Sequence, residues 1–188
     1  FTSKECMNIS QYTPNGNWPT DDVLVQETVK AMNATENQSD FVYTITVEGH
    51  GDYPTEKLLE NPDILVSGAA DEASNNQWEY YVNMIHEVDD FIGDLITAVD
   101  RRGEDPIIVF FGDHLPTMGL TDADMKSGDI FKTKYITWNN MGLAKKDADL
   151  TAYQLLAHIT DQAGIHEGTM FRYHQTQTAS ETYLSGLE

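Results

Sequence analysis

An apolar run that ends abruptly in a polar turn is the feature that most constrains this chain. Residues 107–111 read Ile-Ile-Val-Phe-Phe, and Gly112, Asp113 and His114 follow at once. Five residues without a polar side chain are typical of a strand buried on both faces, as in the centre of a parallel sheet. Gly112 permits the backbone to turn. The run therefore predicts a buried strand that delivers a carboxylate and an imidazole to the edge of a sheet.

Helical and strand patterns alternate along the rest of the chain. Apolar residues recur every three or four positions in segments that predict helices at about 22–32, 77–102 and 150–163. Apolar or alternating segments predict strands at 41–47, 64–66, 107–111 and 134–138. Strands separated by helices favour an α/β domain with a mostly parallel sheet flanked by helices.

A histidine follows the first predicted strand much as Asp113 and His114 follow a later one. His50 lies between Gly49 and Gly51, just beyond residues 41–47. The carboxyl ends of parallel strands meet at one rim of a sheet, where ligands bind, so we expect His50 near Asp113 and His114. A histidine there can donate a hydrogen bond to a phosphate or sulfate oxygen. The alternative is a loop histidine without a ligand.

Asp113 and His114 predict part of a metal site, because an oxygen and a nitrogen ligand suit one divalent cation. A closed site takes about four protein ligands and an open catalytic site about three. The sequence shows no further ligand and no Gly-x-Ser-x-Gly nucleophile. The alternative is an Asp that caps a turn, with an exposed His beside it.

The charge balance excludes one class of partner. The chain has 31 acidic and 11 basic residues and a net charge of −20, so we expect no nucleic-acid binding, which needs Lys and Arg on phosphates. An anionic substrate would need a metal ion or a local cluster of positive donors. No apolar run approaches the roughly 18 residues of a membrane span. The first residue is Phe1, and we expect a soluble fragment of a longer protein.

Three motifs of the sequence belong together: Gly49-His50-Gly51-x-Tyr53-Pro54, Tyr80-Tyr81-x-Asn83-x-Ile85 with Asp89, Phe91 and Ile92, and Phe111-Gly112-Asp113-His114-Leu115-Pro116. In this order they resemble the lipoteichoic acid synthase-like branch of the sulfatase family, in the alkaline phosphatase superfamily. The resemblance covers residues 18–183 or so. It implies an alkaline phosphatase-like fold, with residues 1–188 as the carboxy-terminal part of a sulfatase or phosphoglycerol transferase-like catalytic domain.

The resemblance also implies roles for three residues. Asp113 and His114 correspond to the family's Asp and His metal ligands, and His50 to the histidine that contacts the substrate phosphate. The family's Thr nucleophile and its Glu ligand belong to the amino-terminal half of the domain, which is then the missing partner. An imidazole suits manganese or zinc better than the calcium of true sulfatases. We therefore expect Mn²⁺, with Zn²⁺ or Mg²⁺ as alternatives.

The function implied is that of a metal-dependent phosphoglycerol transferase acting on phosphodiester or phosphoglycerol groups of the cell envelope. The parent enzyme would be membrane-anchored, with this domain on the extracellular face in a Gram-positive-type bacterium, and the isolated fragment would be inactive. The alternatives are a sulfuric or phosphoric ester hydrolase of the same family, a degenerate non-catalytic binding module, and a metal-free α/β domain. A truncated sheet leaves an open edge, so we also expect self-association of the fragment.

Overall fold

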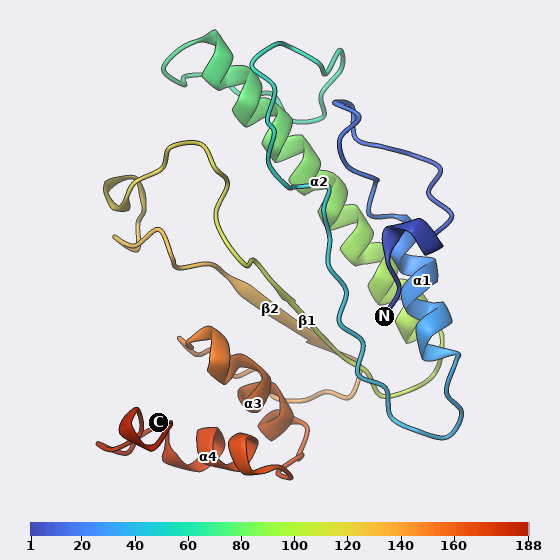
Figure 1. Cartoon of the computed structure of the whole chain (residues 1–188), viewed down its shortest axis with the longest axis vertical. Coiled ribbons are helices and arrows are strands. Elements are labelled where there is room, and N and C mark those ends of the chain that lie inside the picture. Colours follow the sequence, from blue (N-terminus) through green and yellow to red (C-terminus); the bar gives the residue numbers. More distant parts are fainter. Residues whose placement is uncertain (188) are drawn as a thin grey trace. The chain divides into compact units, whose positions relative to one another are not determined.

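A computed structural model describes residues 1–187, which divide into two compact units. The first unit is Phe1–Trp138 and the second is Asn139–Glu188. Figure 1 shows the course of the chain through helices and strands. The elements are α1 (Val23–Met32), α2 (Glu72–Asp100), β1 (Ile107–Phe111), β2 (Tyr135–Asn139), α3 (Ala152–Gln162) and α4 (Thr169–Gln177), with short 3-10 turns at Lys4–Cys6, Asp122–Asp124 and Ser185–Leu187. No helix within residues 1–187 combines the length and the apolar character that a membrane crossing requires.

The long helix α2 is the main element of the first unit. It begins at Glu72, five residues before the predicted start, because Asp71 caps it by accepting a hydrogen bond of 2.7 Å from the amide of Ser74. The apolar periodicity starts only at Trp78, so it could not predict the polar residues at the start of the helix. The remaining helix predictions are confirmed to within about two residues, since α1 and α3 fall inside the expected ranges.

The core lies along α2. Leu24 of α1 packs against three buried residues of α2, Phe91, Leu95 and Val99, and Ile108 and Phe110 of β1 pack against the same cluster. Each fully buried side chain of this size stabilises the fold by roughly 1.5–3 kcal/mol. The core therefore fixes β1, and with it the residues that follow β1, relative to α2.

The sheet differs from the prediction. In residues 1–187 it has two strands, β1 and β2. The amide of Gly112, just after β1, donates to the carbonyl of Lys134, just before β2, at 3.1 Å. The end of one strand thus meets the start of the other, so the pair is antiparallel. Helices and strands do not alternate as predicted, since the order is α1, α2, β1, β2, α3 and α4, and a mostly parallel sheet does not form within the described residues. β1 was expected to be buried on both faces, but it is only half-buried, and Phe111 at its end is 45% exposed.

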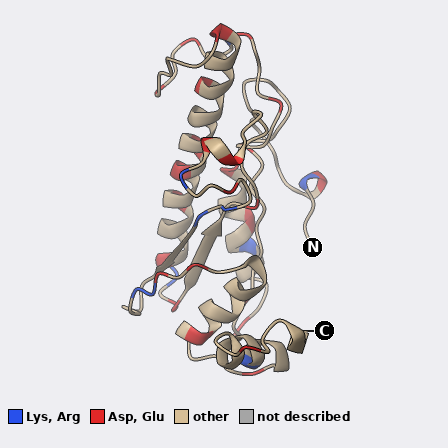
Figure 2. Ribbon diagram, turned by 90° about the vertical axis from the view of Figure 1, so that its left-hand side faces the viewer, with Lys and Arg blue, Asp and Glu red and all other residues tan. Residues whose placement is uncertain are grey.

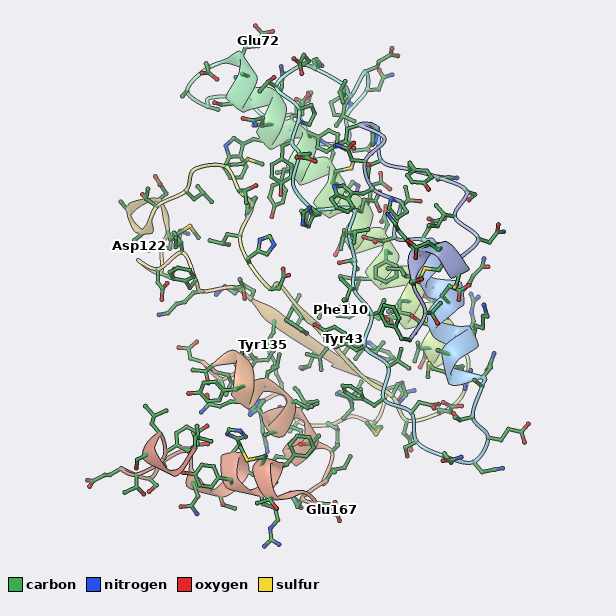
Figure 3. All side chains as sticks on the ribbon, in the orientation of Figure 1. Tyr43, Glu72, Phe110, Asp122, Tyr135 and Glu167 are labelled. Carbon is green, nitrogen blue, oxygen red and sulfur yellow. The ribbon has the colours of Figure 1, made fainter. Side chains whose placement is uncertain are left out.

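The strands predicted at 41–47 and 64–66 do not form. Residues 41–47 run beside β1 without regular secondary structure, and the ring of Tyr43 lies 6.3 Å from that of Phe111 (Figure 3). Phe41, Tyr43 and Ile45 are 75%, 62% and 65% exposed. The alternating pattern was real, but a strand also needs a neighbouring backbone to satisfy its amides and carbonyls. No such neighbour pairs with residues 41–46 in the described chain.

The second unit is a pair of packed helices, α3 and α4. Thr151 caps α3 in a reciprocal capping box with Gln154. Helix α4 is not predicted from the sequence, because its residues are mostly polar. Its single buried residue is His174, whose Nδ1 lies 2.7 Å from the hydroxyl oxygen of Tyr183. This unit carries none of the predicted site residues.

Candidate functional site

Asp113 and His114 lie directly after β1, as the sequence predicts, and both are accessible. Their side chains are 82% and 55% exposed, and Nε2 of His114 is 3.8 Å from Oδ1 of Asp113. Two ligand atoms that each bind a cation at about 2.1 Å can be at most roughly 4.2 Å apart. The two donor atoms are therefore close enough to share one cation.

The protonation of the His114 ring follows from its hydrogen bond. Nδ1 of His114 lies 2.8 Å from the carbonyl oxygen of Leu115. A carbonyl oxygen can only accept, so Nδ1 must carry the proton and donate it. In the neutral ring Nε2 then has a free lone pair. This arrangement, with one ring nitrogen held by a backbone carbonyl, is how metal-binding histidines are commonly oriented.

His50 comes close to this pair, as the position of both groups after predicted strands suggested. The ring centroids of His50 and His114 are 6.3 Å apart, with the rings nearly perpendicular. The flanking glycines have a steric reason. A Cβ at Gly49 would lie 2.9 Å from Cδ1 of Ile85, and one at Gly51 would lie 3.3 Å from Oγ1 of Thr117. A larger residue at either position would therefore require the Ile85 or Thr117 side chain to shift.

Trp18 is a site residue that the sequence reasoning missed. Its ring centroid is 4.5 Å from that of His50, and its Nε1 donates to the carbonyl of Gly51 at 3.1 Å. Nearby, Nδ2 of Asn15 donates to the carbonyl of Asp52 at 3.0 Å. The turn-rich stretch 14–19 is the sequence signal closest to this feature. No local sequence pattern links this stretch to the His50 loop, which lies more than thirty residues further along the chain.

Two buried carboxylates are hydrogen-bonded next to the His50 loop. Asp21 and Glu48 are only 1% and 5% exposed. The pKa of Glu48 is raised to about 7, chiefly by burial, although a hydrogen bond from the Asp21 amide opposes the shift. Burial also raises the pKa of Asp21, against hydrogen bonds from the amides of Val47 and Glu48. Acidic residues are widespread in this chain and basic ones are few (Figure 2).

Within residues 1–187, no three His, Cys, Asp or Glu side chains converge to hold an ion. Asp113 and His114 fit a divalent cation in donor type, separation and ring orientation, and they account for two ligands. A working site takes at least about three.

The chain belongs to the sulfatase family, because residues 3–177 match the family described as Sulfatase. The fold of this family is an α/β fold of the alkaline phosphatase type, and its members are hydrolases or transferases that are generally metal-dependent.

One curated relative is a protein of Rhizobium meliloti (strain 1021) whose provisional name is cyclic β-1,2-glucan modification protein. It is 28% identical over 180 residues, which cover 87% of this chain and 28% of that protein. The chain thus spans less than a third of the relative's length. No solved structure matches the chain.

Proposed function

We propose that this chain is the carboxy-terminal part of the catalytic domain of a metal-dependent phosphoglycerol transferase of the cell envelope. The observation that carries the proposal is the meeting of His50 with the Asp113–His114 pair, with 6.3 Å between the two imidazole rings. A cation ligand pair beside a hydrogen-bond donor is what a phosphoryl group needs, since its charge lies on several oxygens at once.

Asp113 would bind the metal through Oδ1 and His114 through Nε2, the nitrogen left free by the Leu115 hydrogen bond. When bound, a divalent metal supplies Lewis-acid stabilisation of phosphoryl charge and activates an oxygen nucleophile. An imidazole ligand favours Mn²⁺, with Zn²⁺ or Mg²⁺ as alternatives. The nucleophile and the remaining ligands would come from the amino-terminal half of the domain.

His50 would bind and orient the substrate by donating a hydrogen bond to a phosphoryl oxygen. The Trp18 ring contacts the His50 ring, so it limits the directions in which the imidazole can point. The net charge of −20 gives an anionic substrate little general attraction. Binding would therefore depend on the metal and on the local donor at His50.

The proposal also names the acceptor of the phosphoglycerol group. A lipoteichoic acid synthase-like enzyme extends a glycerophosphate chain, whereas the name of the Rhizobium relative points to a glucan. A glucan is uncharged before modification, but a growing glycerophosphate chain is a polyanion that this acidic domain would repel. We therefore favour a glucan as acceptor and a phosphoglycerol lipid headgroup as donor, on the outer face of the cell membrane.

The amino-terminal half of the domain is also the proposed partner of the exposed segment 41–47. Phe41, Tyr43 and Ile45 present apolar side chains to solvent on a segment without a backbone partner. Such surfaces are normally covered. In the whole protein this segment would become a strand of a larger sheet.

The test uses the full-length protein with phosphatidylglycerol carrying a labelled glycerol headgroup, a cyclic β-1,2-glucan and Mn²⁺. We expect label on the glucan, loss of transfer with EDTA, and at least a hundredfold loss in Asp113→Ala, in line with the cost of removing a charge-stabilising group. Asp90→Ala, an exposed α2 carboxylate, is the matched control and should remain active.

Other results would point elsewhere. Label on a glycerophosphate chain but not on glucan would indicate a lipoteichoic acid synthase-like acceptor. Release of free glycerophosphate, or turnover of a sulfate ester in its place, would indicate a hydrolase. Neither turnover nor Mn²⁺ binding would indicate a non-catalytic binding module and would overturn the proposal.

A further inference from the structure

Two loops that are distant in sequence are tied together around His50. Besides the Trp18 and Asn15 hydrogen bonds to the carbonyls of Gly51 and Asp52, three bonds connect Asp21 with the residues just before His50. Oδ1 of Asp21 accepts from the amide of Val47 at 2.9 Å, and Oδ2 accepts from the amide of Glu48 at 3.1 Å. The amide of Asp21 in turn donates to Oε2 of Glu48 at 2.9 Å.

The side chain of Asp21 makes long-range rather than local contacts. The N-cap position of α1 is Asp22, so Asp21 lies one residue outside the helix end. Its carboxylate reaches Val47 and Glu48, which lie 26 and 27 residues further along the chain. It is 1% exposed, and burying a carboxylate is costly unless it is well hydrogen-bonded. A side chain that stayed in solvent at this position would not incur the free-energy cost of burying a charge.

The hydrogen bonds of Asp21 are linked to His50 through Val47. The amide of His50 donates to the carbonyl of Val47 at 3.0 Å, so the residues that Asp21 holds also hold the backbone of His50. On the other side, Trp18 precedes Asp21 by three residues and lies against the His50 ring. Asp21 therefore fixes both the backbone that carries the imidazole and the base of the loop that carries its aromatic neighbour.

We propose that Asp21 is a positioning residue that sets where His50 points, with Glu48 providing the return hydrogen bond. This inference rests on the proposed function, because it gives His50 the task of contacting a phosphoryl group. The role requires a carboxylate at 21. An Asn offers a single acceptor oxygen, so its amide group would face one of the two backbone N–H donors.

The structural arm of the test is NMR on the 188-residue chain. In the wild type we expect a nuclear Overhauser effect between the Trp18 indole and the His50 ring, and slow exchange of the Trp18 indole N–H. In Asp21→Asn the Overhauser effect should disappear, and the indole proton should exchange about tenfold faster or more, since a charge-assisted hydrogen bond is lost. Asp22→Asn is the matched control: it removes the same charge one position away from an exposed side chain and should change neither signal.

The functional arm compares the same variants in the full-length protein. For Asp21→Asn we expect kcat/KM of transfer to fall about tenfold to a hundredfold, as for a misplaced contact group, with Mn²⁺ affinity unchanged. A folded Asp21→Asn chain that keeps the Trp18–His50 Overhauser effect would overturn the inference. So would a variant that loses the effect but transfers phosphoglycerol as well as the wild type.

Two further cases are separable. Should Asp21→Asn fail to fold, Glu48→Ala removes only the return bond, and the Trp18 indole proton should then exchange several-fold faster; unchanged exchange would count against the inference. If the wild-type protein transfers nothing, the proposed function fails. The NMR arm still decides whether Asp21 holds His50 in place.

Discussion

The indole of Trp18 lies against the imidazole of His50, with 4.5 Å between the ring centroids and 58° between the ring planes. The same indole is hydrogen-bonded to the carbonyl of Gly51, the next residue along. Trp18 thus contacts both the side chain and the backbone of the loop that holds the candidate phosphate-binding histidine.

Removing the Trp18 ring should impair substrate binding more than stability. In the full-length protein, Trp18→Ala should lower kcat/KM for transfer by about tenfold or more, because His50 loses its aromatic neighbour. Trp18→Phe keeps an aromatic ring but loses the hydrogen bond to Gly51, so its kcat/KM should lie between those of the wild type and Trp18→Ala. Trp78→Phe, on α2 with its ring against that of Tyr81, is the control. Equal kcat/KM for Trp18→Ala and wild type would rule out this role.

Stability should decline as the pH rises toward 7. The pKa of Glu48 is about 7 in the folded chain, raised mainly by burial and also by Asp21, Glu87 and Asp22, and an unfolded Glu titrates near 4.5. The buried hydroxyl of Tyr80 lies in the field of the same carboxylate. Between these pH values the folded state binds the proton more tightly, so the free energy of unfolding falls with rising pH by on the order of 3 kcal/mol and then levels off.

Urea unfolding at pH 5 and pH 8 measures this effect. Glu48→Gln cannot titrate and keeps an acceptor oxygen for the Asp21 amide, so its difference between the two pH values should shrink. Asp90→Asn, on the exposed side of α2, should leave the difference as in the wild type. An equal pH dependence in Glu48→Gln and wild type would show that Glu48 is not its source.

Metal affinity should depend on both residues after β1. In the full-length protein, Asp113→Ala and His114→Ala should each weaken Mn²⁺ binding about tenfold or more, as measured by calorimetric titration. Leu115 acts only through its backbone carbonyl, so Leu115→Met should bind Mn²⁺ normally. Unchanged affinity in Asp113→Ala would remove that residue from the metal site.

The α1–α2 core should be sensitive to truncation. Leu95 is 6% exposed and packs with Leu24, Phe91 and Val99, so Leu95→Ala should lower the free energy of unfolding by about 2–5 kcal/mol. Thr97→Ala changes an exposed position of the same helix and should have an effect within about 0.5 kcal/mol. Urea denaturation of both variants makes the comparison.

The 188-residue chain should self-associate through its exposed segment. Ile45 and Tyr43 are 65% and 62% exposed on residues 41–47, which have no strand partner. Light scattering after size exclusion should show species larger than a monomer, and Ile45→Lys should shift them toward the monomer. A clean monomer in the wild type would contradict this prediction.

Local patterns predicted the parts of the fold that depend on nearest neighbours. The 3.6-residue periodicity identified α2, and the apolar run identified β1, because both signals are contained within one segment. The placement of Asp113 and His114 after β1 followed for the same reason. The expected closeness of His50 to His114 is also observed, although residues 41–47 do not form the predicted strand.

The sequence by itself thus determined the main helices, the strands β1 and β2, and the position of Asp113 and His114 directly after β1. Only the tertiary structure decided that β1 pairs with β2 in antiparallel fashion, and that Trp18 and Asp21 hold the His50 loop. The physical reason is the range of the interactions. Helix periodicity and strand ends are local, but a strand needs a distant backbone partner. A buried carboxylate such as Asp21 shows its purpose only when the amides of residues 47 and 48 are brought against it.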